Sequence, residues 1–93
     1  MKKIEVLQAL EIFKDRMKEH ILYTPDEPYM YIDTPSYMYK YFDKNDNSIA
    51  CFSYIDYLHE EYDSENYIVN LYFGDSCATL LDFKILKLII ENL

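Results

Sequence analysis

The chain has 93 residues, with nine basic and seventeen acidic side chains, two cysteines, one glycine and no tryptophan. A domain of this length has room for one modest core, and a hydrophobic content of 51% excludes disorder as its main state. The net charge of −8 and the single arginine, Arg16, argue against direct binding of nucleic acid, because such binding depends on Lys and Arg neutralising phosphates.

The first half of the chain contains a helical pattern followed by two tyrosine-rich segments. Apolar residues recur every three or four positions over residues 2–23, which predicts an amphipathic helix that ends before Pro25. Asp-Thr-Pro-Ser at 33–36 predicts a hairpin, in which Tyr37, Tyr39 and Tyr41 share one face of the second strand. In the alternative interpretation, residues 29–32 are irregular and only the second segment is a strand.

The second half predicts two further strands and a C-terminal helix. Residues 49–58 and 67–73 are the strands, preceded by a polar turn at 43–48 and separated by an acidic segment at 59–66. The helix is predicted to begin with a capping box from Thr79 to Asp82. Its apolar residues spread over about 220° of a helical wheel, so it is either sandwiched between the sheet and the first helix or carries a subunit contact.

Together these elements predict one α+β domain over residues 1–93. We expect a small antiparallel sheet of three or four strands, with the N-terminal and C-terminal helices packed on one face. No apolar stretch reaches the length of a membrane span, and no secretory apolar segment follows the basic start. The expected location is therefore the cytoplasm, with both cysteines reduced and no contact with a membrane.

The motifs for metal or cofactor binding are incomplete. Residues 43–48 resemble the start of an EF-hand loop, but Ser48 stands where that loop needs glycine and Tyr54 where it needs glutamate. A solvated turn is the favoured interpretation. The single glycine excludes a dinucleotide fingerprint and a P-loop, and we expect no cofactor and no metal ion.

The chain is not predicted to be an enzyme. A thiol activated by His59 or His20 is the main catalytic alternative, in the form of a small hydrolase using a cysteine or the carboxylates. Cys51 lies in an apolar strand, and Cys77, near the predicted helix start, is the better candidate. Neither cysteine has a flanking nucleophile motif.

The charge is unevenly distributed along the chain. Residues 25–83 contain two basic and twelve acidic residues and ten of the eleven tyrosines, whereas the two flanking segments each have a net charge of +1. Carboxylates among tyrosines suit a basic partner. Alternate residues of a strand lie about 6.6 Å apart, close to the phosphate spacing of a nucleic acid, so such a sheet could imitate one. The alternative is an ordinary solvated surface whose tyrosines cover the core.

The leading hypothesis is a small acidic protein-binding module that inhibits a basic protein, such as a nucleic-acid-binding enzyme, by covering its basic surface. In size, acidity and lack of motifs the chain is similar in type to small inhibitors made by phages and plasmids, including nucleic-acid mimics and anti-CRISPR proteins. The predicted contact residues are Glu60, Glu61, Asp63, Glu65, Asp43, Asp46, Tyr57 and Tyr62.

The second hypothesis is a structural or regulatory homodimer without an inhibitory role. Its contact is the wide apolar arc of the C-terminal helix, and the predicted contact residues are Phe83, Leu86, Ile90 and Leu93.

Overall fold

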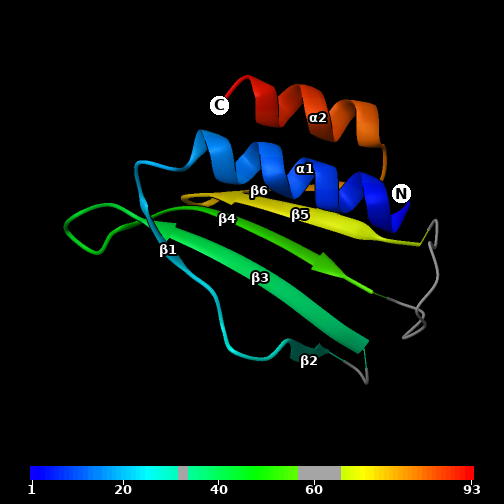
Figure 1. Ribbon diagram of the computed structural model, residues 1–93, viewed down its shortest axis with the longest axis horizontal. Coiled ribbons are helices and arrows are strands. Elements are labelled where there is room, and N and C mark those ends of the chain that lie inside the picture. The colour runs from blue at the N-terminus through cyan, green and yellow to red at the C-terminus, as the bar shows by residue number, and fades with distance from the viewer. Residues whose placement is uncertain (32–33, 57–65) are drawn as a thin grey trace.

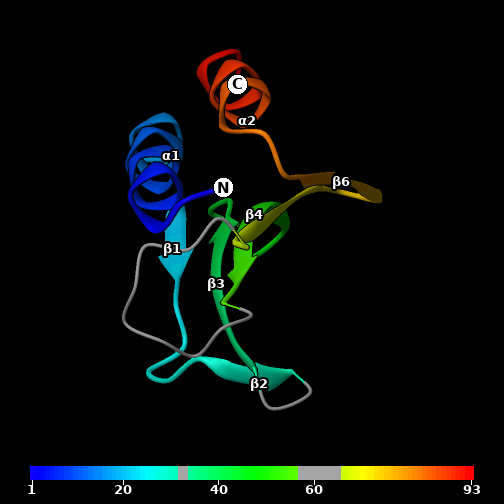
Figure 2. The same cartoon turned by 90° about the vertical axis from the view of Figure 1, so that its right-hand side faces the viewer.

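Two helices lie on the same face of a six-stranded antiparallel sheet (Figures 1 and 2). The computed structural model describes residues 1–31, 34–56 and 66–93. In chain order the elements are α1 (Lys3–Arg16), β1 (Ile21–Tyr23), β2 (Tyr29–Tyr31), β3 (Thr34–Phe42), β4 (Ser48–Ile55), β5 (Ile68–Phe73), β6 (Ser76–Leu80) and α2 (Phe83–Glu91). The α+β class is as expected, but the prediction of three or four strands is wrong. The strand order is β1-β3-β4-β5-β6, and β2 also pairs with β3.

The first unexpected strand, β1, comes from residues predicted to be helical. Helix α1 ends at Arg16, and residues 21–23 pair antiparallel with β3, so that Tyr23 lies opposite Lys40. Ile, Leu and Tyr fit a pleated surface well, and the edge of β3 offers them backbone partners. Tertiary pairing therefore overrides the helical spacing of these residues.

The second unexpected strand, β6, replaces the predicted capping box. The turn at Gly74 and Asp75 returns the chain alongside β5, and Gly74 has the positive φ of 57° that such a tight turn favours. Thr79 lies within β6, where its hydroxyl donates to the side-chain oxygen of Asn70 over 2.8 Å. The N-cap of α2 is Asp82, whose carboxylate accepts from the backbone N–H groups of the second and third residues of the helix.

The two strands of the predicted hairpin do pair, but the turn predicted at 33–36 is wrong, because Thr34, Pro35 and Ser36 lie within β3 and pair with β2. Strand β2 pairs with the start of β3, so residues 29–31 are a strand and the irregular alternative is wrong. Tyr37, Tyr39 and Tyr41 do share one face of β3: Tyr37 lies opposite Tyr54, and Tyr39 lies opposite Phe52.

The core lies between this face and the two helices. Phe13 of α1 packs against Tyr41 and Phe52, with 5.3 Å between ring centroids in both pairs. From α2, Leu86 and Ile90 are completely buried in the same cluster. Neither of the described helices has the length and apolar character needed to cross a membrane.

Candidate functional site

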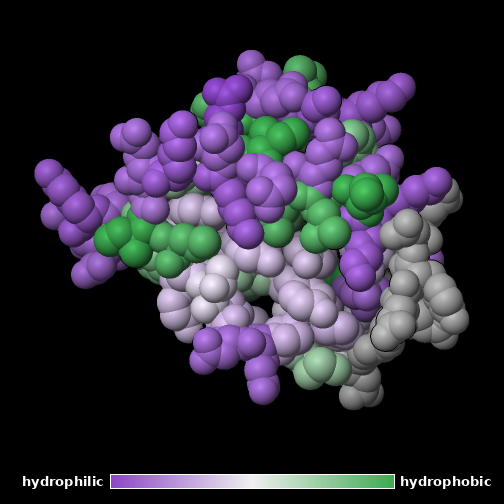
Figure 3. All heavy atoms as spheres, in the orientation of Figure 1, coloured by the Kyte–Doolittle hydropathy of each residue, from purple (hydrophilic) through white to green (hydrophobic). Residues whose placement is uncertain are grey.

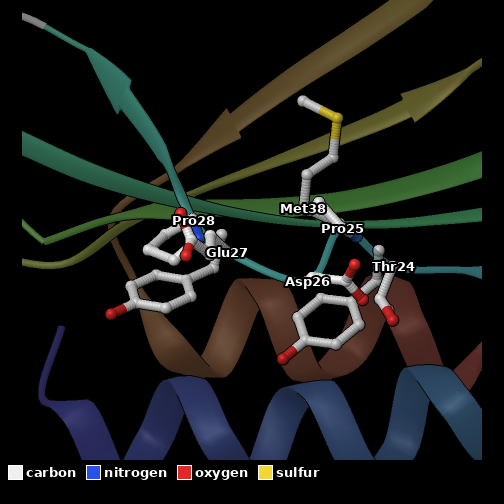
Figure 4. A pocket seen from close by; sticks show the side chains of 8 residues that line it. Thr24, Pro25, Asp26, Glu27, Pro28 and Met38 are labelled. Atoms are coloured by element: carbon white, nitrogen blue, oxygen red, sulfur yellow. The ribbon is translucent and has the colours of Figure 1, made fainter.

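A pocket forms where the chain leaves the edge of the sheet between β1 and β2. Both strands pair with the same side of β3, β1 with residues 40–42 and β2 with residues 34–36. The five residues 24–28 therefore stand opposite only three, 37–39. Pro25 and Pro28 have no N–H group to donate to a strand ladder, so the segment between them bows away from β3. It encloses a pocket of about 190 Å³, the edge pocket, lined by Thr24–Pro28 and Tyr37–Tyr39 (Figure 4).

The edge pocket combines two carboxylates with two aromatic rings. Asp26 and Glu27 are exposed, whereas Tyr37 and Tyr39 are half-buried. Tyr37 and Tyr39 pack against the core, which lies between β3 and the helices, whereas the side chain of Met38 points to the other side of β3 (Figure 4). Side chains of intermediate hydropathy gather over β3, below the more hydrophilic helix layer (Figure 3).

The two rings are held in place by the core. Tyr37 stacks on Tyr54 with 4.9 Å between centroids and 18° between planes, and Tyr39 lies opposite Phe52 and packs against the core. Burial raises the pKa of Tyr54 far above its usual value, and the neighbouring Tyr39 and Tyr37 hydroxyls add to this, so its hydroxyl keeps its proton at neutral pH. The rings of Tyr37 and Tyr39 are therefore held in place before any ligand binds.

A cation of the protein itself already lies over one of these two rings. The ammonium nitrogen of Lys14, on α1, lies 4.8 Å from the centroid of the Tyr39 ring. This separation is within the range of cation–π attraction. The ring of Tyr39 therefore has a face that accepts a positive charge.

The acidic residues of the sheet lie in its connections. None of the six described strands contains Asp or Glu, and Lys40 is their only charged residue. Mimicry of a nucleic acid by carboxylates spaced about 6.6 Å apart along a strand is therefore not possible on these strands. The negative charge surrounds the sheet at its turns and at the edge pocket.

Asp43 and Asp46, two predicted contact residues, form the turn between β3 and β4. The Asp43 carboxylate accepts from the backbone N–H groups of Asn45 (2.8 Å) and Asn47 (3.0 Å), and these bonds, that of Asn47 first, lower the pKa of Asp43. Asp46 is exposed and has a φ of 63°. The EF-hand-like residues therefore stabilise a tight turn, and within the described ranges no three metal-ligating side chains cluster.

The other predicted contact residues lie outside the described residues: Glu60, Glu61, Asp63, Glu65, Tyr57 and Tyr62. The chain on either side of them is well anchored. The Tyr67 hydroxyl donates to Asp56 over 3.0 Å, and the Met1 ammonium group donates to the Tyr67 carbonyl over the same distance. Residues 56 and 67 are therefore held together at one end of the sheet.

The predicted dimer residues divide between the core and the surface. Leu86 and Ile90 are completely buried, Phe83 packs against the core, and Leu93 is exposed. The wide apolar arc thus has an inner half that belongs to the protein's own core. Its outer half is the exposed set Leu81, Ile85 and Leu88.

The cysteines do not lie where the thiol hypothesis needs them. Cys77 is exposed within β6 and does not lie at a helix N-terminus, because α2 begins only at Phe83. Cys51 is buried, which raises the pKa of its thiol. Tyr72 lies between them in the strand register, and burial followed by its hydrogen bond with Cys77 raises the pKa of Tyr72.

The face of the sheet away from the helices contains a second, larger hollow of about 460 Å³. None of the residues that line it is charged: Tyr29, Met30, Ser36, Met38, Ser53, Ile55, Asn70 and Tyr72. A basic partner is therefore not attracted to this face, and the edge pocket remains the better candidate.

No family model, curated protein or solved structure matches the chain. The edge pocket and the distribution of charge are therefore the features that indicate a function. The pocket was not predicted, although the two prolines on either side of Asp26 and Glu27 are a usable signal of interrupted pairing.

Proposed function

We propose that this chain is a protein-binding module without catalytic activity, whose edge pocket receives a lysine or arginine side chain of a basic partner. By covering a basic surface, the module keeps nucleic acid from binding there and so inhibits a nucleic-acid-binding protein. This proposal keeps the role inferred from the charge and gives it a specific contact point.

The observation that carries the proposal is the pairing of two carboxylates with two fixed aromatic rings. Asp26 and Glu27 provide negative charge, and Tyr39 already holds an ammonium group over its ring. Lys and Arg are the side chains that combine charge with affinity for an aromatic face. The pocket of about 190 Å³ is smaller than the roughly 300–1,000 Å³ of small-molecule sites, so one side chain fits it better than a metabolite.

The pocket acts as an anchor within a larger contact. An exposed ion pair contributes about 0.2–1 kcal/mol and a cation–π contact about 0.5–2 kcal/mol, whereas micromolar affinity requires about 8 kcal/mol. Further carboxylates must therefore take part. In this proposal they come from the acidic connections, including the 57–65 segment and the turn with Asp43 and Asp46, and they also speed association by long-range attraction.

Titration with a fluorescent oligo-arginine peptide tests the anchor. The Asp26→Asn, Glu27→Gln double variant is expected to bind roughly 3- to 30-fold more weakly at low salt, because two charge contacts are lost. The matched control is Asp15→Asn, Glu19→Gln, which removes the same charge from exposed positions at the end of α1 and beyond it. Equal losses in the two double variants would show that only net charge matters, and the anchor would be rejected.

The inhibitory role needs a second experiment. A partner purified with the module from its native host should lose nucleic-acid binding as the module is added, and should regain it when salt is raised. A partner that binds the module and nucleic acid at the same time contradicts inhibition while leaving the anchor intact.

A further inference from the structure

Strand β6 is an edge strand without the usual protection. It is the last strand in the sheet order, and no other strand in the described part of the chain pairs with its outer side. Its residues, Ser76–Leu80, include no charge and no proline, and Ser76, Cys77, Ala78 and Thr79 are all exposed. Edge strands normally carry Lys, Pro or a bulge, because alternate residues direct free N–H and C=O groups outward.

The opposite edge of the sheet is protected. There β1 and β2 occupy one side of β3, and Pro25 and Pro28 flank the segment that bows away between them. The strands at that edge have only three residues each, so the five residues of β6 are the longest uninterrupted edge in the described sheet.

Exposed apolar side chains adjoin this edge. Leu81 follows β6 directly, and Ile85 and Leu88 continue along the outer side of α2, with exposed fractions of 63%, 52% and 63%. Figure 2 shows β6 projecting to the side, with α2 above it. A partner strand added to β6 would therefore also meet an apolar helix surface.

We infer that this surface binds a second copy of the chain, with the two β6 strands antiparallel and the outer sides of the two α2 helices in contact. An antiparallel pair of identical strands has two-fold symmetry and closes after two copies. In the register centred on Ala78, Asp75 of each copy lies opposite Leu81 of the other.

The charge of this surface favours a second acidic copy over a basic partner. The Asp82 carboxylate is engaged with the N-terminus of its own helix, and Glu91 lies 3.8 Å from Lys87. The surface is thus close to neutral, so two chains of net charge −8 meet here with little repulsion.

The dimer is expected to be weak and bivalent. A standard interface covers about 800 Å² of each partner, about an eighth of the 6279 Å² surface of this chain, and one short strand with one helix side provides less. Pairing at β6 creates a sheet ten strands wide and leaves both edge pockets free at its far ends. This inference does not depend on the proposed function, but two pockets would increase the avidity for a basic surface.

Sedimentation velocity over roughly 1–300 micromolar protein tests the dimer. The wild type should change from monomer to dimer with concentration. The Cys77→Lys variant adds a charge to the β6 edge, and the Ile85→Glu, Leu88→Glu double variant adds charge to the outer side of α2. Each of these two variants should raise the protein concentration at which half of the chain is dimeric by at least about tenfold. Met30→Lys, at an exposed position on β2, is the control and should behave as the wild type. A wild type that stays monomeric, or a dimer indifferent to the β6 and α2 variants, overturns the inference.

Cross-linking tests the register. In a Cys77→Ser, Ala78→Cys variant, the two new thiols meet at the two-fold axis, and mild oxidation should give a covalent dimer. Cys77→Ser, Ser48→Cys places the thiol at an exposed position on β4 and should give none. A variant that sediments as a dimer but does not cross-link at residue 78 contradicts the proposed pairing.

Discussion

The ammonium group of Lys14 lies 4.8 Å from the centroid of the Tyr39 ring, so a side chain of α1 reaches an aromatic face of the edge pocket on β3. Tyr39 lies opposite Phe52 and packs against the buried core. We therefore expect Lys14 to compete for the Tyr39 ring with a cation that enters the pocket, and this competition can be measured.

Replacing Lys14 with methionine should strengthen binding of the oligo-arginine peptide. The substitution frees the ring face, and a cation–π contact at an exposed site contributes about 0.5–1 kcal/mol, which corresponds to roughly a 2- to 5-fold gain in affinity. Lys18→Met is the control, because it also removes one positive charge, but Lys18 contacts Asp15 at 3.8 Å and not the Tyr39 ring. Equal gains for the two variants, measured by calorimetry, would mean that Tyr39 takes no part.

The two halves of the α2 apolar arc should differ sharply in stability measurements. Leu86→Ala removes a completely buried side chain and should lower the free energy of unfolding by about 2–5 kcal/mol in urea titrations. Leu88→Ala changes an exposed position and should alter it by less than about 0.5 kcal/mol. A similar cost for both, at a concentration where the chain is monomeric, would contradict this division.

Asp82 should be the residue that fixes the start of α2. Its carboxylate accepts from the N–H groups of Lys84 at 2.8 Å and Ile85 at 3.3 Å, so Asp82→Ala is expected to cost about 1 kcal/mol of stability. Asp75→Ala removes the same charge from the β5–β6 turn and serves as the control. If thermal melts show no difference between these variants, the cap is not formed as described.

Alkaline pH should destabilise the fold through its buried tyrosines. Burial raises the pKa of Tyr54 and of Tyr41 above the value of about 10 in the unfolded chain. The unfolded state therefore releases these protons first, so the stabilising contribution is complete below pH 10 and falls as pH rises above it. Parallel titrations by circular dichroism and phenolate absorbance should show Tyr54→Phe unfolding at a higher pH than the wild type. An unchanged alkaline midpoint for Tyr54→Phe would count against this cause.

Local patterns predicted the parts of the fold that local geometry determines. The turn predicted at 33–36 is wrong, since Thr34–Ser36 lie in β3, but the pairing of the two tyrosine-rich segments and the shared face of Tyr37, Tyr39 and Tyr41 follow from the local pattern. The β1 strand does not, because Ile21 continues the spacing of α1 and only pairing with β3 makes it extended. For β6 a signal was present, since Gly74-Asp75 is a favoured two-residue turn.

The edge pocket depends on a register that the sequence does not reveal. Residues 24–28 bow outward only because Tyr23 pairs with Lys40 and Tyr29 pairs with Ser36, which leaves five residues opposite three. The uneven charge was the basis for predicting a basic partner, and it favoured the longest acidic run, residues 60–65, as the contact. Asp26 and Glu27, between Pro25 and Pro28, form a shorter acidic segment, and the structure places them at a defined pocket.

Amide chemical-shift mapping tests the central claim most directly. Arginine methyl ester, added to isotopically labelled protein, should shift the backbone signals of residues 24–28 and 37–39, except those of the two prolines, which have no amide proton. The shifts should follow one saturable curve and disappear in Asp26→Asn, Glu27→Gln. Shifts spread evenly over all acidic connections, or unchanged by that double substitution, would contradict an anchor pocket at the sheet edge.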